Sequence, residues 1–252
     1  MNGLKTEISK WLQDYLEQSG LSCFVVGVSG GVDSAVVSTL CAQTGLETLV
    51  LNMPINSKPV NTSLSELHCQ ELTEKYVNVS SLKIDATDAF DSFLTGVTDH
   101  LGTSKLAEAN SKARMRMMIL YYAAANNKGI VVGTGNKVED FGVGFYTKYG
   151  DGGVDVSPIA DLTKTQVRRL AKELEVNPRI IAAPPTDGLW EDDRTDEEQI
   201  GASYEELEWA METEKAPEDM TGREKEVLEV YRHFNKRNSH KMNPIPIFRL
   251  NV

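Results

Sequence analysis

The fold can be inferred from one stretch of the sequence, CFVVGVSGGVDSAVV, residues 23–37. Its apolar first part, Cys23–Val28, predicts a buried strand, and the small apolar residues from Ser34 to Gln43 predict a helix. The glycine-rich turn Ser29–Ser34 joins the two. Backbone N–H groups in such a turn, at the start of a helix, bind anions. The stretch therefore predicts a loop that binds phosphate.

This loop carries a carboxylate where a phosphate loop commonly carries a lysine. Asp33 stands close to the start of the predicted helix. A bound polyphosphate then needs another cation, and Mg²⁺ prefers oxygen ligands. We therefore expect Asp33 to hold Mg²⁺, which screens the phosphates. The alternative is a glycine-rich turn that Asp33 only caps, but the complete Ser29–Ser34 string after a strand favours the phosphate loop.

Apolar runs and helical patterns alternate through the first half of the chain. Strands are predicted at 49–53, 82–85 and 129–133, and helices at 61–76, 87–98 and 104–127. This alternation predicts a doubly wound α/β fold, with a mainly parallel sheet and helices on both faces. Ligands of such sheets bind outside the carboxyl ends of the strands. The loop Thr134–Asp140, after one strand, should therefore lie beside Ser29–Ser34.

The pattern changes after about residue 141. Glycines are frequent between 142 and 153, which predicts an irregular, functional loop. Thr163 and Gln166 have the spacing of a capping box and predict the start of a helix. Further helices are predicted at 196–213 and 222–237, followed by a proline-rich tail. We expect a single domain over residues 1–252.

Two apolar stripes at helical spacing are predicted to face the core. The first consists of Met115, Met118, Ile119 and Tyr122. The second consists of Tyr204, Leu207, Trp209 and Met211. This second stripe lies in an acidic segment, whose carboxylates should face solvent.

The charge distribution bears on the kind of partner. Residues 190–232 hold 16 acidic and 5 basic residues, so this segment alone accounts for the net charge of −11 of the whole chain. A pI near 4.9 without a basic stripe argues against a nucleic-acid surface, so small molecules are the expected partners. The three cysteines show no C-x-x-C spacing, and no apolar run is long enough to span a membrane. We expect a cytoplasmic protein.

Residues 29–34, Ser-Gly-Gly-Val-Asp-Ser, resemble the signature loop of the N-type ATP pyrophosphatases, enzymes with an adenine nucleotide alpha hydrolase-like fold. Within that group the chain resembles the ammonia-dependent NAD synthetases over nearly its whole length. The stretches that carry the resemblance are 110–117, 132–139, 144–152, 157–159 with Lys164, 185–190, and His240-Lys241. Residues 191–194 depart from the sequence common in many members, which affects local loop geometry.

The resemblance implies an activity. Such an enzyme uses ATP to amidate deamido-NAD with ammonia, giving NAD, AMP and pyrophosphate as the final step of NAD biosynthesis. Hydroxide is a poor leaving group, so the carboxylate is first converted to an acyl-adenylate. The enzyme must then hold a triphosphate, a carboxylate and an amine together, which requires positioning and electrostatic stabilisation. The resemblance also implies a homodimer with the dinucleotide held at its interface.

The resemblance also implies roles for individual residues. Asp33 and Glu139 would bind Mg²⁺, Asp151 would receive ammonium, and Lys164 would contact the ATP phosphates. Asp33, Asp151 and Lys164 are the expected catalytic residues. ATP as co-substrate would contact Gly27, Val28, Ser29, Gly30, Gly31, Val32, Asp33, Ser34, Thr134, Lys164 and Thr186. Deamido-NAD would contact Arg114, Lys148, Asp155, His240 and Lys241.

The residues by themselves leave other interpretations open. Lys164 follows a predicted helix start, where a cation opposes the helix dipole, so it could be an exposed cation without a ligand. His240 and Lys241 could belong to a mobile basic terminus. For the whole chain, the alternatives are a tRNA-modifying enzyme of the same fold and a regulatory module that binds ATP without chemistry. The first is expected to show a basic surface, and the second to lack the metal carboxylates or Lys164.

Overall fold

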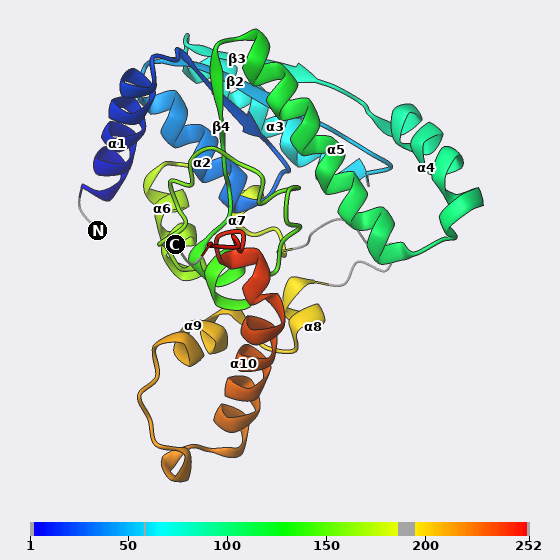
Figure 1. Ribbon diagram of the computed structural model, residues 1–252. Coiled ribbons are helices and arrows are strands. Elements are labelled where there is room, and N and C mark those ends of the chain that lie inside the picture. Colours follow the sequence, from blue (N-terminus) through cyan, green and yellow to red (C-terminus); the bar gives the residue numbers. More distant parts are fainter. Residues whose placement is uncertain (1–2, 58, 186–194, 251–252) are drawn as a thin grey trace.

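A parallel sheet of four strands, in the order β3-β2-β1-β4, lies in the upper part of the molecule in Figure 1. The computed structural model describes residues 3–57, 59–185 and 195–250. The strands are β1 (Cys23–Gly27), β2 (Glu47–Asn52), β3 (Val79–Lys83) and β4 (Gly129–Val132). Beyond β4 the ladder continues, because Gly133 N donates to Val156 O at 2.7 Å. The strand predicted at 82–85 corresponds to β3, which begins and ends earlier, at Val79 and Lys83.

Helices cover both faces of the sheet, as predicted. The first five are α1 (Leu4–Ser19), α2 (Val32–Gln43), α3 (Pro59–Lys75), α4 (Thr87–Leu101) and α5 (Lys105–Asn126). Phe24 and Val26 of β1 pack on one side, in the cluster that includes residues of α1, α2 and α3. Val25 packs on the other side, against α5. Since successive residues of a strand point to opposite faces, both faces are buried and the doubly wound α/β fold is confirmed.

Further elements follow in the second half of the chain. They are the π-helix η1 (Lys137–Val143), α6 (Lys164–Glu173), α7 (Pro178–Ile181), α8 (Asp196–Ile200), α9 (Tyr204–Glu212), the 3₁₀ helix η2 (Pro217–Asp219) and α10 (Gly222–Met242). Of these, α8, α9 and α10 lie below the sheet in Figure 1. Buried residues of η1, α9 and α10 form a core of their own, which includes Val138, Tyr204, Leu207 and Val227. α6 contacts both α2 and α9, and so joins this core to the sheet.

Several local predictions were wrong, each for a physical reason. The helix at 196–213 is two helices, because Gly201 adopts a left-handed conformation (φ 90°) that ends α8. The predicted loop Thr134–Asp140 includes the start of η1. α10 extends to Met242, so His240 and Lys241 lie in its last turn and not in a tail.

The stripe on α5 is only partly in the core. Ile119 packs under the sheet and Met115 against Phe90, but Met118 and Tyr122 are 60% and 74% exposed. α5 contacts the sheet through the side that carries Ile119, so Met118 and Tyr122 reach solvent. In the described ranges, no helix combines the length and the apolar character that crossing a membrane requires.

His68 joins α3 to α2 inside the core. Its ring is 3% exposed, and Nε2 lies 2.9 Å from Oγ of Ser38. Burial lowers the pKa of His68 to about 4. The unfolded chain binds a proton at this residue near pH 6.5. Between these values the folded protein keeps the imidazole neutral while the unfolded chain charges it.

We expect His68 to make the protein less stable as the pH falls from about 6.5 to about 4. In that window the unfolded state binds the extra proton, so the free energy of unfolding falls by up to about 1.4 kcal/mol per pH unit from this group. Urea unfolding of His68→Gln should therefore show a shallower pH dependence than wild type. His100→Gln, on the exposed surface of α4, is the control. A wild-type slope in His68→Gln would contradict the prediction.

Candidate functional site

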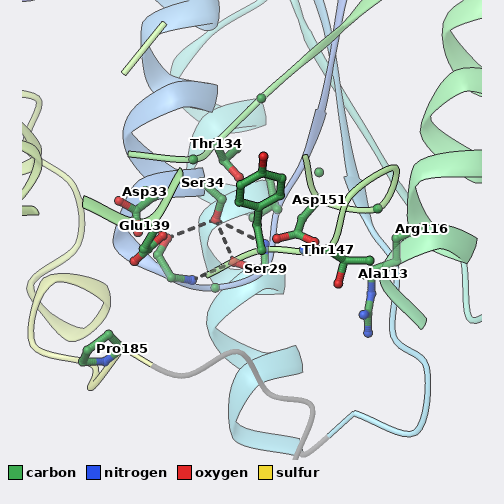
Figure 2. Close-up of a pocket in the computed structure, with 18 of the residues that line it drawn as sticks. Ser29, Asp33, Ser34, Ala113, Arg116, Thr134, Glu139, Thr147, Asp151 and Pro185 are labelled. Carbon is green, nitrogen blue, oxygen red and sulfur yellow. Dashed lines mark hydrogen bonds between the residues drawn. The ribbon is translucent and has the colours of Figure 1, made fainter. Parts of the chain in front are cut away.

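A pocket of about 460 Å³ opens at the carboxyl ends of β1 and β4 (Figure 2). The central position of β1 explains its place: in a doubly wound sheet, ligands bind where the connections after two neighbouring strands diverge. The loop after β1, the loop after β4, the segment 145–154, α5 and α6 all contribute side chains to its lining. The loop after β1 lies about a hundred residues before the loop after β4 in the sequence, and the two meet at this edge of the sheet.

The loop after β1 is built around Ser34. Its Oγ accepts from Ser29 N at 3.2 Å and donates to Gly31 O at 3.0 Å. Gly30 has a φ of 91°, a left-handed conformation that favours glycine. α2 begins at Val32, so its first backbone N–H groups point toward the pocket. The loop thus has the geometry of an anion site at a helix N-terminus.

Asp33, Glu139 and Lys164 form a buried charge cluster at one end of the pocket, which we call the acid–lysine cluster. Lys164 Nζ donates to Asp33 Oδ2 at 2.6 Å and to Glu139 Oε1 at 2.9 Å. Figure 2 shows the two carboxylates side by side. Asp33 makes no capping hydrogen bond in α2, and Lys164 is only 3% exposed. Neither the interpretation of Asp33 as a simple cap nor that of Lys164 as an exposed cation describes the structure.

The electrostatics of this cluster favour one more cation. Burial raises the pKa of Asp33, and the attraction of Lys164 only partly offsets this. Burial also opposes ionisation of Glu139, but Lys164 and a hydrogen bond from Tyr204 outweigh it and lower the pKa of Glu139. The pKa of Lys164 is raised: burial lowers it, but the two carboxylates outweigh that effect. One ammonium thus faces two acidic groups.

Two further residues hold the cluster, and the sequence did not identify either. Asn136 is 0% exposed; its Nδ2 donates to Asp33 Oδ1 at 3.1 Å, and its Oδ1 accepts from Glu139 N at 3.1 Å. Tyr204 was predicted only as a core residue, yet its hydroxyl donates to Glu139 Oε1 at 2.5 Å. The signal available for Asn136 was its place before a helical turn, where asparagine is a good N-cap.

Asp151 and Asp140 line the pocket near the cluster. Oδ1 of Asp151 accepts from Thr147 N at 2.9 Å, and burial raises its pKa. Burial and the neighbouring carboxylates, Glu139 first, raise the pKa of Asp140 well above its usual value. Gly135 packs so closely on the Asp140 carboxylate that a Cβ would overlap it. Asp140 was not among the predicted site residues.

The residues predicted to bind ATP gather around this pocket. Those that line it are Gly27, Val28, Ser29, Gly30, Gly31, Val32, Asp33, Ser34, Thr134 and Lys164. Thr186 lies outside the described residues. The structure thus brings together the parts of the ATP site that it describes, while their contacts with a nucleotide stay predictions.

The residues predicted to bind deamido-NAD lie in three places. Lys241 lines the pocket, where its Nζ donates to Gly144 O at 2.7 Å and Tyr146 O at 2.8 Å. Arg114 and Lys148 do not line it. Nε of Arg114 donates to the Lys148 carbonyl at 3.3 Å, and Lys148 Nζ donates to the His240 carbonyl at 2.7 Å. Arg114, Lys148 and His240 thus form a group beside the pocket.

Asp155 supports the sheet. Its carboxylate accepts from the Tyr121 hydroxyl at 2.9 Å and from Val131 N at 2.8 Å, and it is not part of the pocket lining. Arg116 lines the pocket instead of Arg114, at the end opposite Asp33 in Figure 2, and its Nε donates to Met53 O at 2.9 Å. Residues two apart on a helix point in different directions, so only one of the two arginines faces the pocket.

Comparison with known proteins identifies the family. The chain matches the NAD synthase family over residues 4–245. It is 38% identical over 240 residues to the NH(3)-dependent NAD(+) synthetase of Carboxydothermus hydrogenoformans, covering 94% of this chain and 93% of that protein.

Two solved structures are also similar to the chain. The NMN synthetase of Francisella tularensis superposes with a TM-score of 0.88 at 30% identity, over 100% of this chain and 98% of the other. The NH3-dependent NAD synthetase of Campylobacter jejuni gives 0.79 at 25% identity, over 98% and 99%. With the family match over nearly the whole sequence, these likenesses show that the chain belongs to the NAD synthase family.

Proposed function

We propose that this enzyme uses ATP to amidate deamido-NAD with ammonia, through an acyl-adenylate, and releases NAD, AMP and pyrophosphate. The observation that carries the proposal is the acid–lysine cluster, placed at the start of α2 beside a loop built to bind an anion. A polyphosphate in that loop meets backbone N–H groups and the Lys164 ammonium. These groups stabilise the negative charge that leaves with pyrophosphate.

The cluster fits Mg²⁺. This ion is usually bound by one or two carboxylates together with phosphates of the substrate, and Asp33 and Glu139 supply that pair. In the described ranges, no three His, Cys, Asp or Glu side chains gather as a ready metal centre, so phosphate oxygens and water would complete the coordination. When bound, Mg²⁺ neutralises phosphate charge. Lys164 contacts both carboxylates here, and the ATP phosphates offer its ammonium other partners.

Asp151 is proposed to receive the ammonium ion. Its carboxylate lines the pocket and is held by the backbone of Thr147. A carboxylate attracts ammonium and can accept the proton that ammonium loses. Ammonia then attacks the activated carbonyl, and AMP leaves.

We also propose a homodimer of single-domain subunits, each spanning residues 1–252. Met118 and Tyr122 form an exposed apolar surface on α5, the helix that carries Arg114. A second subunit on this surface would bury it and close over the group Arg114, Lys148 and His240. That arrangement explains why these dinucleotide residues lie beside the pocket and not in it.

A second candidate substrate is the acid mononucleotide that corresponds to NMN. The observation that favours it is the likeness to the Francisella tularensis NMN synthetase over 100% of this chain. Either acid would use the same ATP site and the same chemistry. The two acids differ in the adenosine monophosphate part of the molecule, which deamido-NAD contains and the mononucleotide lacks.

The first prediction concerns the substrates. We expect pyrophosphate release with ATP, ammonium and deamido-NAD, and a lower kcat/KM with nicotinate mononucleotide. Glutamine should not replace ammonium, because a glutaminase needs an activated nucleophile such as a thiolate. Cys23, Cys41 and Cys69 are all buried, and burial raises the pKa of each thiol. A preference for the mononucleotide would reassign the substrate, and equal rates with glutamine would refute the choice of donor.

The second prediction concerns the two carboxylates. Asp33→Asn and Glu139→Gln should each lower kcat for pyrophosphate release about a hundredfold or more, since each removes a ligand and a charge from the phosphate end of the site. Glu212→Gln, at an exposed position of α9, is the matched control. Near-normal pyrophosphate release by either variant would remove that residue from the metal site.

The third prediction concerns Lys241. It holds the backbone at Gly144 and Tyr146, and it is proposed to contact the dinucleotide. Lys241→Met should therefore raise the KM for deamido-NAD about tenfold, the effect of losing one hydrogen bond to a charged group, and change the KM for ATP little. Lys225→Met, exposed on the same helix, is the control. An equal rise in both KM values would indicate a disturbed loop and no contact with the dinucleotide.

A further inference from the structure

Tyr204 touches both the negative and the positive side of the acid–lysine cluster. Its hydroxyl donates to Glu139 Oε1 at 2.5 Å and lies 3.3 Å from Oδ2 of Asp196. Lys164 Nζ lies over its ring, 4.8 Å from the centroid. The side chain is fully buried. A residue placed by its sequence pattern in the core therefore reaches into the site.

The position of Tyr204 is fixed from several directions. It is the first residue of α9, and Ser203 forms a capping box with Glu206 at this helix start. Its backbone N–H donates to Glu197 Oε1 at 2.9 Å. Its ring belongs to the core shared by η1, α9 and α10, which includes Leu207 and Val227. The hydroxyl is thus presented to Glu139 from a rigid support.

The hydrogen bonds from Lys164 and Tyr204 both end on the same oxygen, Oε1 of Glu139. If Lys164 turns toward ATP phosphates, Glu139 loses its strongest partner. The hydroxyl of Tyr204 does not depend on Lys164 and can stay. Carboxylates that bind metals are commonly held by such an outer hydrogen bond, and losing it weakens metal binding about tenfold to a hundredfold.

We propose that Tyr204 is a positioning residue: its hydroxyl keeps the Glu139 carboxylate oriented for a divalent cation while Lys164 contacts the phosphates. The proposal rests on the role of Glu139 as a metal ligand, stated above as part of the proposed function. It makes the C-terminal helical core a part of the site, since the support of a metal ligand comes from α9. The contribution belongs to the hydroxyl and not to the ring.

Tyr204→Phe tests this directly, because it keeps the ring, its packing and its contact with Lys164 and removes only the hydroxyl. The probe is Mn²⁺, whose binding to full-length protein with a non-hydrolysable ATP analogue is followed by electron paramagnetic resonance. We expect the Kd for Mn²⁺ to rise about tenfold or more. The Mg²⁺ concentration for half-maximal pyrophosphate release should rise in parallel. The KM for deamido-NAD should stay within about twofold of wild type.

Tyr231→Phe is the matched control, because Tyr231 packs on the same helical core, while the hydrogen bond to Glu139 comes from Tyr204. It should bind Mn²⁺ as wild type does. A Tyr204→Phe protein with a wild-type Kd for Mn²⁺ would overturn the proposal, whether or not its Tm falls. Glu139→Gln separates this failure from that of the metal role proposed for Glu139. If Glu139→Gln also binds Mn²⁺ normally, Glu139 is not a ligand, and its metal role and the inference about Tyr204 both fail. If only Glu139→Gln loses Mn²⁺, the inference about Tyr204 alone fails.

Discussion

The contact of one ammonium, Lys164, with two carboxylates, Asp33 and Glu139, is the interaction on which the site depends. The three charges are largely withdrawn from water, and a buried charge is tolerated only with a partner of opposite sign and further hydrogen bonds. Lys164 and Asp33 are separated by 131 residues, and Lys164 and Glu139 by 25. The pairing therefore fixes α2, η1 and α6 relative to one another. Removing Lys164 would leave two buried carboxylates without their cation, whereas removing one carboxylate would leave a single buried ion pair.

The sheet makes this contact possible. β1 lies between β2 and β4, so the loops that follow β1 and β4 leave the same edge side by side. The first brings Asp33 and the anion-binding N–H groups, and the second brings Asn136 and Glu139. α6 adds Lys164 from the side, where its capping box fixes the first turn. Each segment is ordinary by itself, and the chemistry arises where they meet.

The chain belongs to the NAD synthase family, which uses ATP as a co-substrate. The acid substrate is a separate question. The group formed by Arg114, Lys148 and His240 lies beside the pocket, and the exposed face of α5 continues from it. Discrimination between a dinucleotide and a mononucleotide is therefore proposed to depend on this outer region and on a second subunit, not on the acid–lysine cluster.

The sequence by itself predicted the α/β fold and the phosphate loop. These follow from local signals, since apolar runs define strands, and loops that follow parallel strands share an edge. The pairing of Asp33 with Glu139 rested on the family resemblance, which also assigned Arg114, whereas Arg116 lines the pocket. The sequence pattern did not identify Tyr204 as a residue of the site. A periodic pattern indicates which face of a helix is buried. It does not indicate which atom the polar end of a buried side chain, such as the hydroxyl of Tyr204, will contact.

The tertiary structure decided those contacts. Tyr204 meets Glu139 across 65 residues, and Asn136 meets Asp33 across 103. The end of α10 was also decided there: Lys241 remains helical where it donates to backbone carbonyls at Gly144 and Tyr146. Hydrogen bonds between segments so far apart form only after the sheet and the helical core have placed them. No spacing in the sequence encodes them.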